Sequence, residues 1–222
     1  MNKSIKLSSF LILFFLLSTY NPTYKFKVKK SIFIIKDIKI ENNKILNTKN
    51  ILDELESLKG QSLFFLDSKI IKSAIKQFDF VSSFEIKKIY PGTIKIKIFE
   101  KKPVAVYVDK ENKFYVSEKG DLIKYLEHEN YNDLPMLFGK MNNFKQFFKD
   151  LKNINFPINS IKSFQYFEIG RWDIVLNNEK IIKLPKENYL NILENFLLIN
   201  GDKNFDNYKI FDYRIKDQLI LN

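Results

Sequence analysis

The segment that most constrains the fold runs from residue 81 to 105 and has the pattern of a β-hairpin. In residues 94–98 isoleucines alternate with lysines, as in a strand with one buried and one solvated face. Residues 84–89 alternate in the same way until the last isoleucine breaks phase, which predicts a bulge or an outward apolar side chain. Residues 90–93, Tyr-Pro-Gly-Thr, predict a type II turn between the two strands. Pro103 ends the hairpin because proline cannot donate to a ladder.

The fifty residues before the hairpin predict one strand followed by two helices. Residues 31–41 alternate apolar and polar side chains and predict a strand. The first helix begins at an N-cap, either Asn47 or Thr48, and stops at Gly60. A short apolar run, which we expect to be buried, precedes a second helix capped by Asp67. The order β-α-α-β-β predicts a compact α+β domain in which two helices cover one face of a three-stranded sheet.

The pattern changes after the hairpin, and residues 104–222 predict a mixed, β-rich domain with two helices. The helices are expected at 144–151 and 186–200, where apolar residues recur at helical spacing. Residues 134–139 predict a buried loop or an edge segment. The expected strands are 104–108, 114–116, 122–123, 161–168, 172–176, 180–184, 208–213 and 218–221.

The N-terminal segment predicts a membrane anchor. Residues 1–6 are short and basic, and residues 7–24 carry no charge. A cleaved signal peptide would need a small-x-small site, and residues 18–22 do not supply one, so an uncleaved anchor is favoured. The basic tail is expected to stay in the cytoplasm while the rest of the chain lies outside. Residues 25–30 then form a lysine-rich juxtamembrane linker.

The net charge of +11 does not by itself predict a nucleic-acid-binding protein. Among 37 basic residues only Arg171 and Arg214 are arginines, and the lysines are spread along the whole chain. A solvated surface is therefore the favoured interpretation, with attraction to an anionic membrane surface as the next. We expect no nucleic-acid partner.

The composition also argues against an enzyme. There is no cysteine, His128 is the only histidine, and six glycines do not form a phosphate-binding loop. Three carboxylates lie near His128, at Glu127, Glu129 and Asp133, but they do not have the spacing of a calcium-binding loop. We interpret this segment as a solvated loop. We expect no cofactor and no metal site, and a function in contacts with other proteins.

Five motifs, in order, give the chain a resemblance to a known family. They are the run Gly-Gln-Ser-Leu-Phe-Phe-Leu-Asp at 60–67, the hairpin at 81–105, the Gly…Leu-Pro…Gly pattern at 120–139, the Arg-Trp…Leu pattern at 171–184 and Asp-Tyr-Arg at 212–214. In this order they resemble the FtsQ/DivIB family of bacterial cell-division proteins, over nearly the whole chain. Lysine often stands where the family has arginine.

The resemblance implies a layout for the whole chain. It comprises a cytoplasmic tail at 1–6, a transmembrane helix at 7–24, a linker at 25–30, a POTRA domain at 31–103 and an FtsQ-type β domain at 104–222. The protein is then a single-pass component of the inner membrane at the division septum, with its N-terminus in the cytoplasm and its C-terminal domains in the periplasm.

The resemblance also implies partners. Such proteins link early and late division proteins without catalysing a reaction and help to control septal peptidoglycan synthesis. The C-terminal edge strand is expected to bind an FtsB/FtsL-type coiled coil by strand addition. The resemblance further implies that FtsK recruits the protein through its POTRA domain. The expected partner-binding residues are Arg171, Tyr213, Arg214, Ile215 and Leu219.

Two other functions compete with this interpretation. One is a periplasmic POTRA-type protein-binding module of an outer-membrane assembly or secretion system. Such proteins usually carry tandem POTRA repeats, and no internal repeat is seen in this sequence. The other is a basic nucleic-acid-binding module, which would not need the uncharged segment 7–24.

Overall fold

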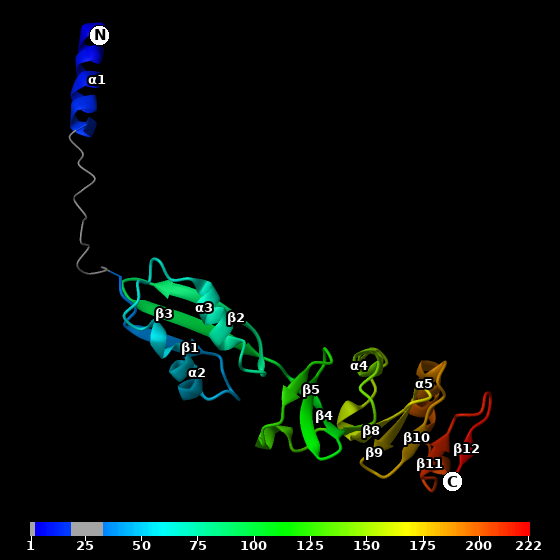
Figure 1. The fold of residues 1–222 in the computed structure, drawn as a ribbon. Coiled ribbons are helices and arrows are strands. Elements are labelled where there is room, and N and C mark those ends of the chain that lie inside the picture. Colours follow the sequence, from blue (N-terminus) through cyan, green and yellow to red (C-terminus); the bar gives the residue numbers. More distant parts are fainter. Residues whose placement is uncertain (1–2, 19–32) are drawn as a thin grey trace.

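The structure is a computed structural model that describes residues 3–18 and 33–222 (Figure 1). Helix α1 (Lys3–Ser18) has exposed apolar side chains from residue 10 to residue 17. Within the described residues, no helix has both the length and the apolar character needed to cross a membrane. The predicted transmembrane helix at 7–24 overlaps α1, and its last six residues lie outside the described residues, as does the linker at 25–30. Both stay predictions.

Residues 33–101 contain a three-stranded sheet covered on one face by two helices (Figure 1). The strand order is β1-β3-β2, with β1 parallel to the central β3 and β2 antiparallel to it. The predicted order β-α-α-β-β is confirmed. The elements are β1 (Asp37–Glu41), α2 (Thr48–Leu55), a 3₁₀ turn (Glu56–Leu58), α3 (Ser68–Ile75), β2 (Val81–Ile89) and β3 (Thr93–Glu100).

Both helices of this first domain begin at the side-chain caps that the sequence predicts. The Asn47 side chain accepts from the Lys49 N–H at 2.8 Å, which selects Asn47 over Thr48 as the cap. Asp67 accepts from the Lys69 N–H at 2.8 Å. The apolar sides of the helices meet the isoleucines of β3 in one core, whose fully buried members are Ile35, Ile51, Leu55, Leu58, Leu63, Ile71, Ile75, Ile94, Ile96 and Ile98.

The short apolar run before α3 is only half buried, which corrects the prediction for it. Leu63 and Leu66 enter the core, but Phe64 and Phe65 are 63% and 82% exposed. The run lies in a loop and not in a regular element, so only its two outer residues reach the core.

The turn of the hairpin also differs from the prediction. The Tyr90–Pro91 peptide bond is cis, and Gly92 does not have a positive φ, so the type II turn is wrong. Glycine is needed for another reason, since a Cβ at Gly92 would lie 2.5 Å from the Ile34 carbonyl oxygen. The ladder between β2 and β3 is irregular between Val81 and Ser83, and its register is continuous from Ser83 to the turn. The bulge that the sequence offered as one explanation for Ile89 is therefore absent.

The second part of the chain folds around a nine-stranded mixed sheet formed within residues 103–221. The strand order is β12-β11-β10-β9-β8-β7-β4-β5-β6, and the pairs β10–β11, β4–β7 and β7–β8 are parallel. The strands are β4 (Pro103–Asp109), β5 (Asn112–Ser117), β6 (Leu122–Lys124), β7 (Met136–Phe138), β8 (Ile161–Phe167), β9 (Arg171–Leu176), β10 (Ile181–Lys183), β11 (Ile210–Asp212) and β12 (Ile220–Leu221).

The two predicted helices of this domain are confirmed. They are α4 (Phe144–Asn153) and α5 (Tyr189–Ile199), which lie on one face of the sheet (Figure 1). Phe147 of α4 stacks on Trp172 of β9 with ring centroids 4.7 Å apart, and Phe196 of α5 meets Phe211 of β11 edge-on at 5.1 Å. Short 3₁₀ turns lie at Glu129–Tyr131, Ile158–Ser160 and Lys203–Phe205.

The segment 134–139, expected to be a loop or an edge, holds an interior strand. Strand β7 lies between β4 and β8 and is parallel to both. At its end Gly139 has φ +88°, and a Cβ there would lie 2.1 Å from the Tyr166 carbonyl oxygen. Glycine therefore allows β7 to approach β8 closely.

A third, smaller core joins the two domains. Phe80, which precedes β2, packs edge-on against Tyr115 of β5 with ring centroids 6.0 Å apart, and it stacks on Tyr131 at 6.3 Å. On the same side, the Glu100 carboxylate accepts from the backbone N–H groups of Lys44, Ile45 and Leu46, with its Oε1 at 3.0, 3.0 and 2.8 Å.

Candidate partner-binding edge

Strand β12 forms one edge of the nine-stranded sheet. It pairs antiparallel with β11 through Phe211↔Leu221 and Asp212↔Ile220, and no second strand among residues 3–18 and 33–222 pairs with it. The open side of an edge strand offers unpaired N–H and C=O groups to another chain. The prediction that the last strand is a sheet edge is therefore confirmed.

The hydrogen bonds at the end of β12 show which backbone groups face the open side. Asn222 exchanges two bonds with Ile210, at 2.9 and 3.1 Å. Hydrogen-bonded and non-hydrogen-bonded pairs alternate along an antiparallel ladder. The adjacent pair Phe211↔Leu221 is therefore of the non-bonded type, and the Leu221 N–H and C=O point away from β11.

A row of polar side chains crosses the sheet toward this edge. The register places Gln165, Asp173, Lys183 and Asp212 side by side on four neighbouring strands, and the row ends at Ile220 on β12. Directly opposed residues project from the same face of a sheet. This face is opposite to the one covered by α4 and α5, since the alternate residues of these strands belong to the core.

Arg214 forms a bidentate ion pair at the β12 end of this row. Its Nε donates to Asp212 Oδ1 at 2.7 Å and to Oδ2 at 2.9 Å, and its Nη2 also donates to Oδ2. The hydrogen bonds from Arg214 lower the pKa of the Asp212 carboxyl below its usual value. The Arg214 side chain is 39% exposed, so part of the guanidinium remains accessible from outside.

Arg171 approaches the same row from β9. Its guanidinium lies over the Phe167 ring, 4.4 Å from the ring centroid, and its Nε is 3.8 Å from Asp173 Oδ1. Neither of these two atoms has a hydrogen-bond partner among the described residues. Burial raises the pKa of Asp173, against the opposing effects of Arg171, Arg214 and Lys183. Three cations thus surround two carboxylates on this face.

Tyr213 faces the other side of the sheet. Its side chain is 7% exposed and belongs to the core beneath α5, and burial raises its pKa to about 12. A residue in this position supports the edge from below, and only a small part of it lines the groove beside the edge strand.

Ile215 and Leu219 border a groove beside the edge strand. The groove has a volume of about 760 Å³ and lies between residues 185–195, which lead into and begin α5, and residues 213–219. Ile215 is 51% exposed, and Leu219 is half-buried against the core. The groove also contains three asparagines of the α5 side, Asn188, Asn191 and Asn195, which the sequence reasoning did not identify.

The predicted site residues therefore fall into three groups. Arg171 and Arg214 meet around the buried carboxylates of Asp173 and Asp212, Ile215 and Leu219 border the groove, and Tyr213 is buried beneath the edge. Asp173 and Asp212 were missed as part of the site, although each lies two residues from one of the arginines in sequence. Together the parts offer backbone groups, apolar contact and partly exposed cations, which suits an extended segment with acidic side chains.

Comparison with known proteins defines the class to which this fold belongs. Residues 33–101 match the family model of the POTRA domain, FtsQ-type, and residues 105–214 match that of the cell division protein FtsQ/DivIB, C-terminal. The chain is thus a POTRA protein with a cell-division C-terminal domain. Strand β12 lies beyond the second match.

Characterised relatives agree with these two matches. Cell division protein FtsQ of Rickettsia bellii is 28% identical over 196 residues, which are 85% of this chain and 72% of that protein. Cell division protein FtsQ of Rhizobium meliloti is 24% identical over 70% of this chain and 51% of its own length. The chain belongs to the FtsQ/DivIB family of cell-division proteins.

One solved structure is also similar. It is the major extracytoplasmic domain of the trans isomer of the cell division protein DivIB from Geobacillus stearothermophilus, with a TM-score of 0.34 and 15% identity. The similarity covers 49% of this chain and 98% of that one.

Proposed function

We propose that this protein is a non-enzymatic scaffold that links early and late division proteins at the septum. In this proposal the β12 edge binds an FtsB/FtsL-type coiled coil and so helps to control septal peptidoglycan synthesis. The family match supports the role in cell division. The observation that carries the partner site is the open edge of β12, with the outward Leu221 backbone next to the partly exposed Arg214.

The proposed binding is strand addition. An incoming extended segment completes the ladder at Leu221 and places every second side chain on the face that carries Arg214 and Arg171. An acidic residue of the partner there joins a cluster that already has more cations than carboxylates. Its other side chains extend over the groove beside Ile215 and Leu219.

The proposed topology is a single pass through the inner membrane. Residues 7–24 form the anchor, the N-terminus is cytoplasmic and residues 31–222 lie in the periplasm. The uncharged sequence of this segment and the exposed apolar side chains of α1 support the anchor. Lys3, Lys6 and the amino terminus are placed on the cytoplasmic side, and the lysines of residues 25–30 are placed at the headgroups of the outer face.

A second contact is proposed for the POTRA domain. Strands β1 and β2 are the two edges of its sheet, since they flank β3. Recruitment by FtsK is assigned to this domain. The alternative role, in an outer-membrane assembly or secretion system, is less well supported because the C-terminal domain matches a cell-division family.

Two substitutions at the β12 edge test the partner site. Arg214→Glu reverses the charge that faces the partner, and Leu219→Lys places a charge at the groove. Each is expected to weaken binding of a purified FtsB/FtsL-type pair at least about tenfold, which is about 1.4 kcal/mol, in a pull-down or titration. Trp172 fluorescence and circular dichroism check that each variant is folded.

Matched controls lie at the opposite edge of the same sheet. Lys124→Glu and Leu122→Lys make the same kinds of change on β6, where both residues are exposed. They are expected to leave the affinity unchanged. Equal affinity of all four variants and the unmodified protein would rule out the β12 site.

A further inference from the structure

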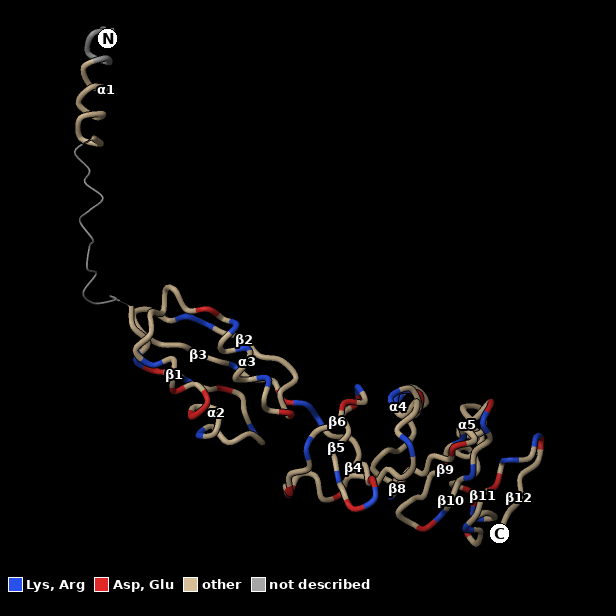
Figure 2. The backbone as a smooth tube through the Cα atoms, in the orientation of Figure 1, with Lys and Arg blue, Asp and Glu red and all other residues tan. Residues whose placement is uncertain are grey.

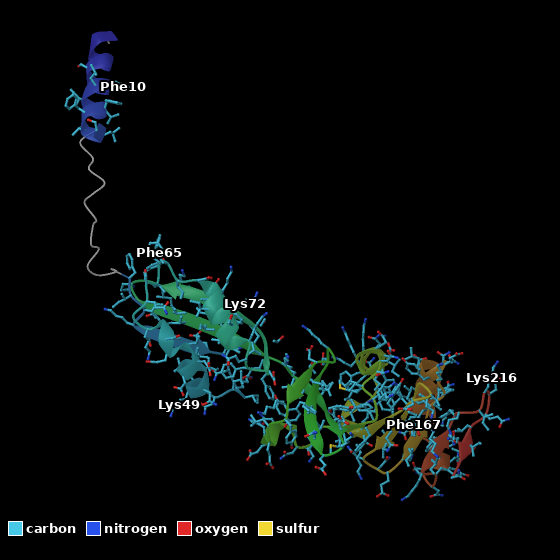
Figure 3. All side chains as sticks on the ribbon, viewed as in Figure 1. Phe10, Lys49, Phe65, Lys72, Phe167 and Lys216 are labelled. Atoms are coloured by element: carbon cyan, nitrogen blue, oxygen red, sulfur yellow. The ribbon has the colours of Figure 1, made fainter. Side chains whose placement is uncertain are left out.

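Exposed aromatic side chains gather at one end of the POTRA domain, the end at which Phe33 begins the described residues 33–222. Phe33, Phe64, Phe65 and Tyr90 are 36%, 63%, 82% and 51% exposed. Phe65 marks this end in Figure 3, far from the C-terminal sheet. Large apolar side chains that remain outside a core in one group indicate a contact surface.

Backbone hydrogen bonds hold the three segments that carry these residues together. The Leu63 N–H donates to the Phe33 carbonyl at 2.7 Å, and the Lys36 N–H donates to the Gly92 carbonyl at 2.8 Å. The Phe33 and Tyr90 rings meet edge-on with centroids 5.1 Å apart, and Phe64 and Phe65 meet at 5.0 Å. The aromatic group is therefore one surface on a rigid part of the domain.

Two lysines lie within this surface. Lys88 Nζ is 3.4 Å from the carbonyl oxygens of Phe64 and Leu66. Lys36 lies beside the hairpin turn, with its Cγ 3.4 Å from the position that a Cβ on Gly92 would take. Both lysines are exposed. Aromatic rings with lysines beside them are typical of protein surfaces that lie at the interface between lipid tails and headgroups.

We propose that this surface, defined as Phe33, Lys36, Phe64, Phe65, Lys88 and Tyr90, docks on the outer face of an anionic lipid bilayer. The rings enter the headgroup region, and the two lysines bind lipid phosphates. The proposal rests on the membrane anchor of the proposed function. Eight residues, 25–32, separate the proposed anchor from Phe33. They span at most about 30 Å even when fully extended, so the bilayer stays within reach of this end of the domain.

This contact would fix the orientation of the protein on the membrane. Figure 3 shows Phe65 and Lys216 at opposite ends of residues 33–222, and Lys216 lies beside the groove at β12. With the aromatic surface on the lipid, the β12 edge is held away from the bilayer. A coiled-coil partner anchored in the same membrane would then contact this edge at a fixed distance from the bilayer, and the length of residues 33–222 sets that distance.

A site-specific label tests the proposal. The chain has no cysteine, so a single cysteine takes the label alone. Phe65→Cys, labelled with the fluorophore NBD, is reconstituted as full chain into phosphatidylcholine vesicles with 30% phosphatidylglycerol. The matched control is Leu198→Cys on α5, because Leu198 and Phe65 are similarly exposed, at 80% and 82%. Nitroxide lipids are expected to quench position 65 at least about twofold more than position 198.

The outcomes separate this proposal from the anchor. Vesicle flotation reports the anchor, and a chain that does not float contradicts both proposals. A chain that floats while positions 65 and 198 are quenched equally overturns the lipid contact alone. A concentration-dependent blue shift at position 65 without lipid quenching would show contact with a second copy and would also overturn it. Lys36→Glu with Lys88→Glu, or removal of phosphatidylglycerol, is expected to lower the quenching at position 65.

Discussion

Asp173 and Asp212 lie in one row of the C-terminal sheet, but their pKa values shift in opposite directions. Asp212 receives two donors of the Arg214 guanidinium, and these hydrogen bonds lower its pKa. Asp173 is 3% exposed, its nearest arginine nitrogen is 3.8 Å away, and burial therefore raises its pKa. The same residue type on β9 and on β11 thus contributes to stability with opposite sign at neutral pH.

Replacing each carboxylate by its amide tests this difference. At pH 7, Asp212→Asn is expected to lower the free energy of unfolding by about 1–2 kcal/mol, because it removes a charge-assisted pair. Asp173→Asn is expected to leave it unchanged or to raise it, because the charged form of Asp173 is disfavoured by burial. Urea unfolding followed by the fluorescence of Trp172, the only tryptophan, measures both.

The pH dependence has a defined sign. Because the folded-state pKa of Asp212 is lowered, its stabilisation is present above the unfolded-state pKa of about 3.9 and is lost as the pH falls below it. Asp212→Asn should therefore remove part of the acid sensitivity. For Asp173 the penalty is present at neutral pH and is relieved as the pH falls through its raised value. A larger loss of stability in Asp173→Asn than in Asp212→Asn at pH 7 would contradict this account.

Single residues were predictable from sequence where the cause is local. Asn47 and Asp67 cap their helices because a side-chain oxygen reaches an N–H two residues ahead, which sequence spacing alone specifies. The burial of Tyr213 was not predictable, because it depends on α5 lying beneath β11. The exposure of Phe64 and Phe65 was not predictable either, since hydrophobicity alone favours burial.

Among the elements, Glu100 does more than end the hairpin. Its carboxylate accepts from three successive N–H groups, of Lys44, Ile45 and Leu46, in the loop that precedes α2. Three donors aimed at one carboxylate form a strong, charge-assisted contact. The contact fixes this loop at the end of β3, beside the aromatic core that joins the two domains.

Glu100→Gln is expected to loosen this loop without unfolding either domain. The amide keeps the shape of the side chain but presents one acceptor oxygen and no charge, so each remaining hydrogen bond is weaker. Amide hydrogen exchange at residues 44–46 should become at least about fivefold faster, which corresponds to about 1 kcal/mol. Glu41→Gln, which breaks the exposed pair with Lys95, is the control and should not change exchange there. Unchanged exchange in Glu100→Gln would refute the role of the carboxylate.

Elements with strong periodicity were predictable, and short ones were not. The hairpin strands and the helices at 48–55, 68–75, 144–153 and 189–199 follow from alternation or from helical spacing. Strand β7 has three residues, too few for a pattern, and its parallel neighbours are far away in the sequence. The type II turn was wrong because the Tyr90–Pro91 bond is cis, an isomer that the local sequence does not specify.

Across residues 33–222, basic and acidic positions are interspersed along the backbone of both domains (Figure 2). The lysines do not collect in one stripe, which agrees with the prediction of a solvated surface. The two arginines, far apart in the sequence, meet around Asp173 because β9, β10 and β11 are adjacent. The sequence indicated both arginines as candidate site residues, but only the strand order explains why they lie at one place.

The central claim is that a partner extends the sheet at β12, and amide hydrogen exchange of the full chain in a membrane tests it most directly. The Leu221 N–H faces the open edge, whereas the Asn222 N–H is already bonded to Ile210. On addition of an FtsB/FtsL-type pair, we predict strong slowing of exchange at Leu221 and little relative change at Asn222. Bound partner with exchange at Leu221 unchanged would contradict strand addition at this edge.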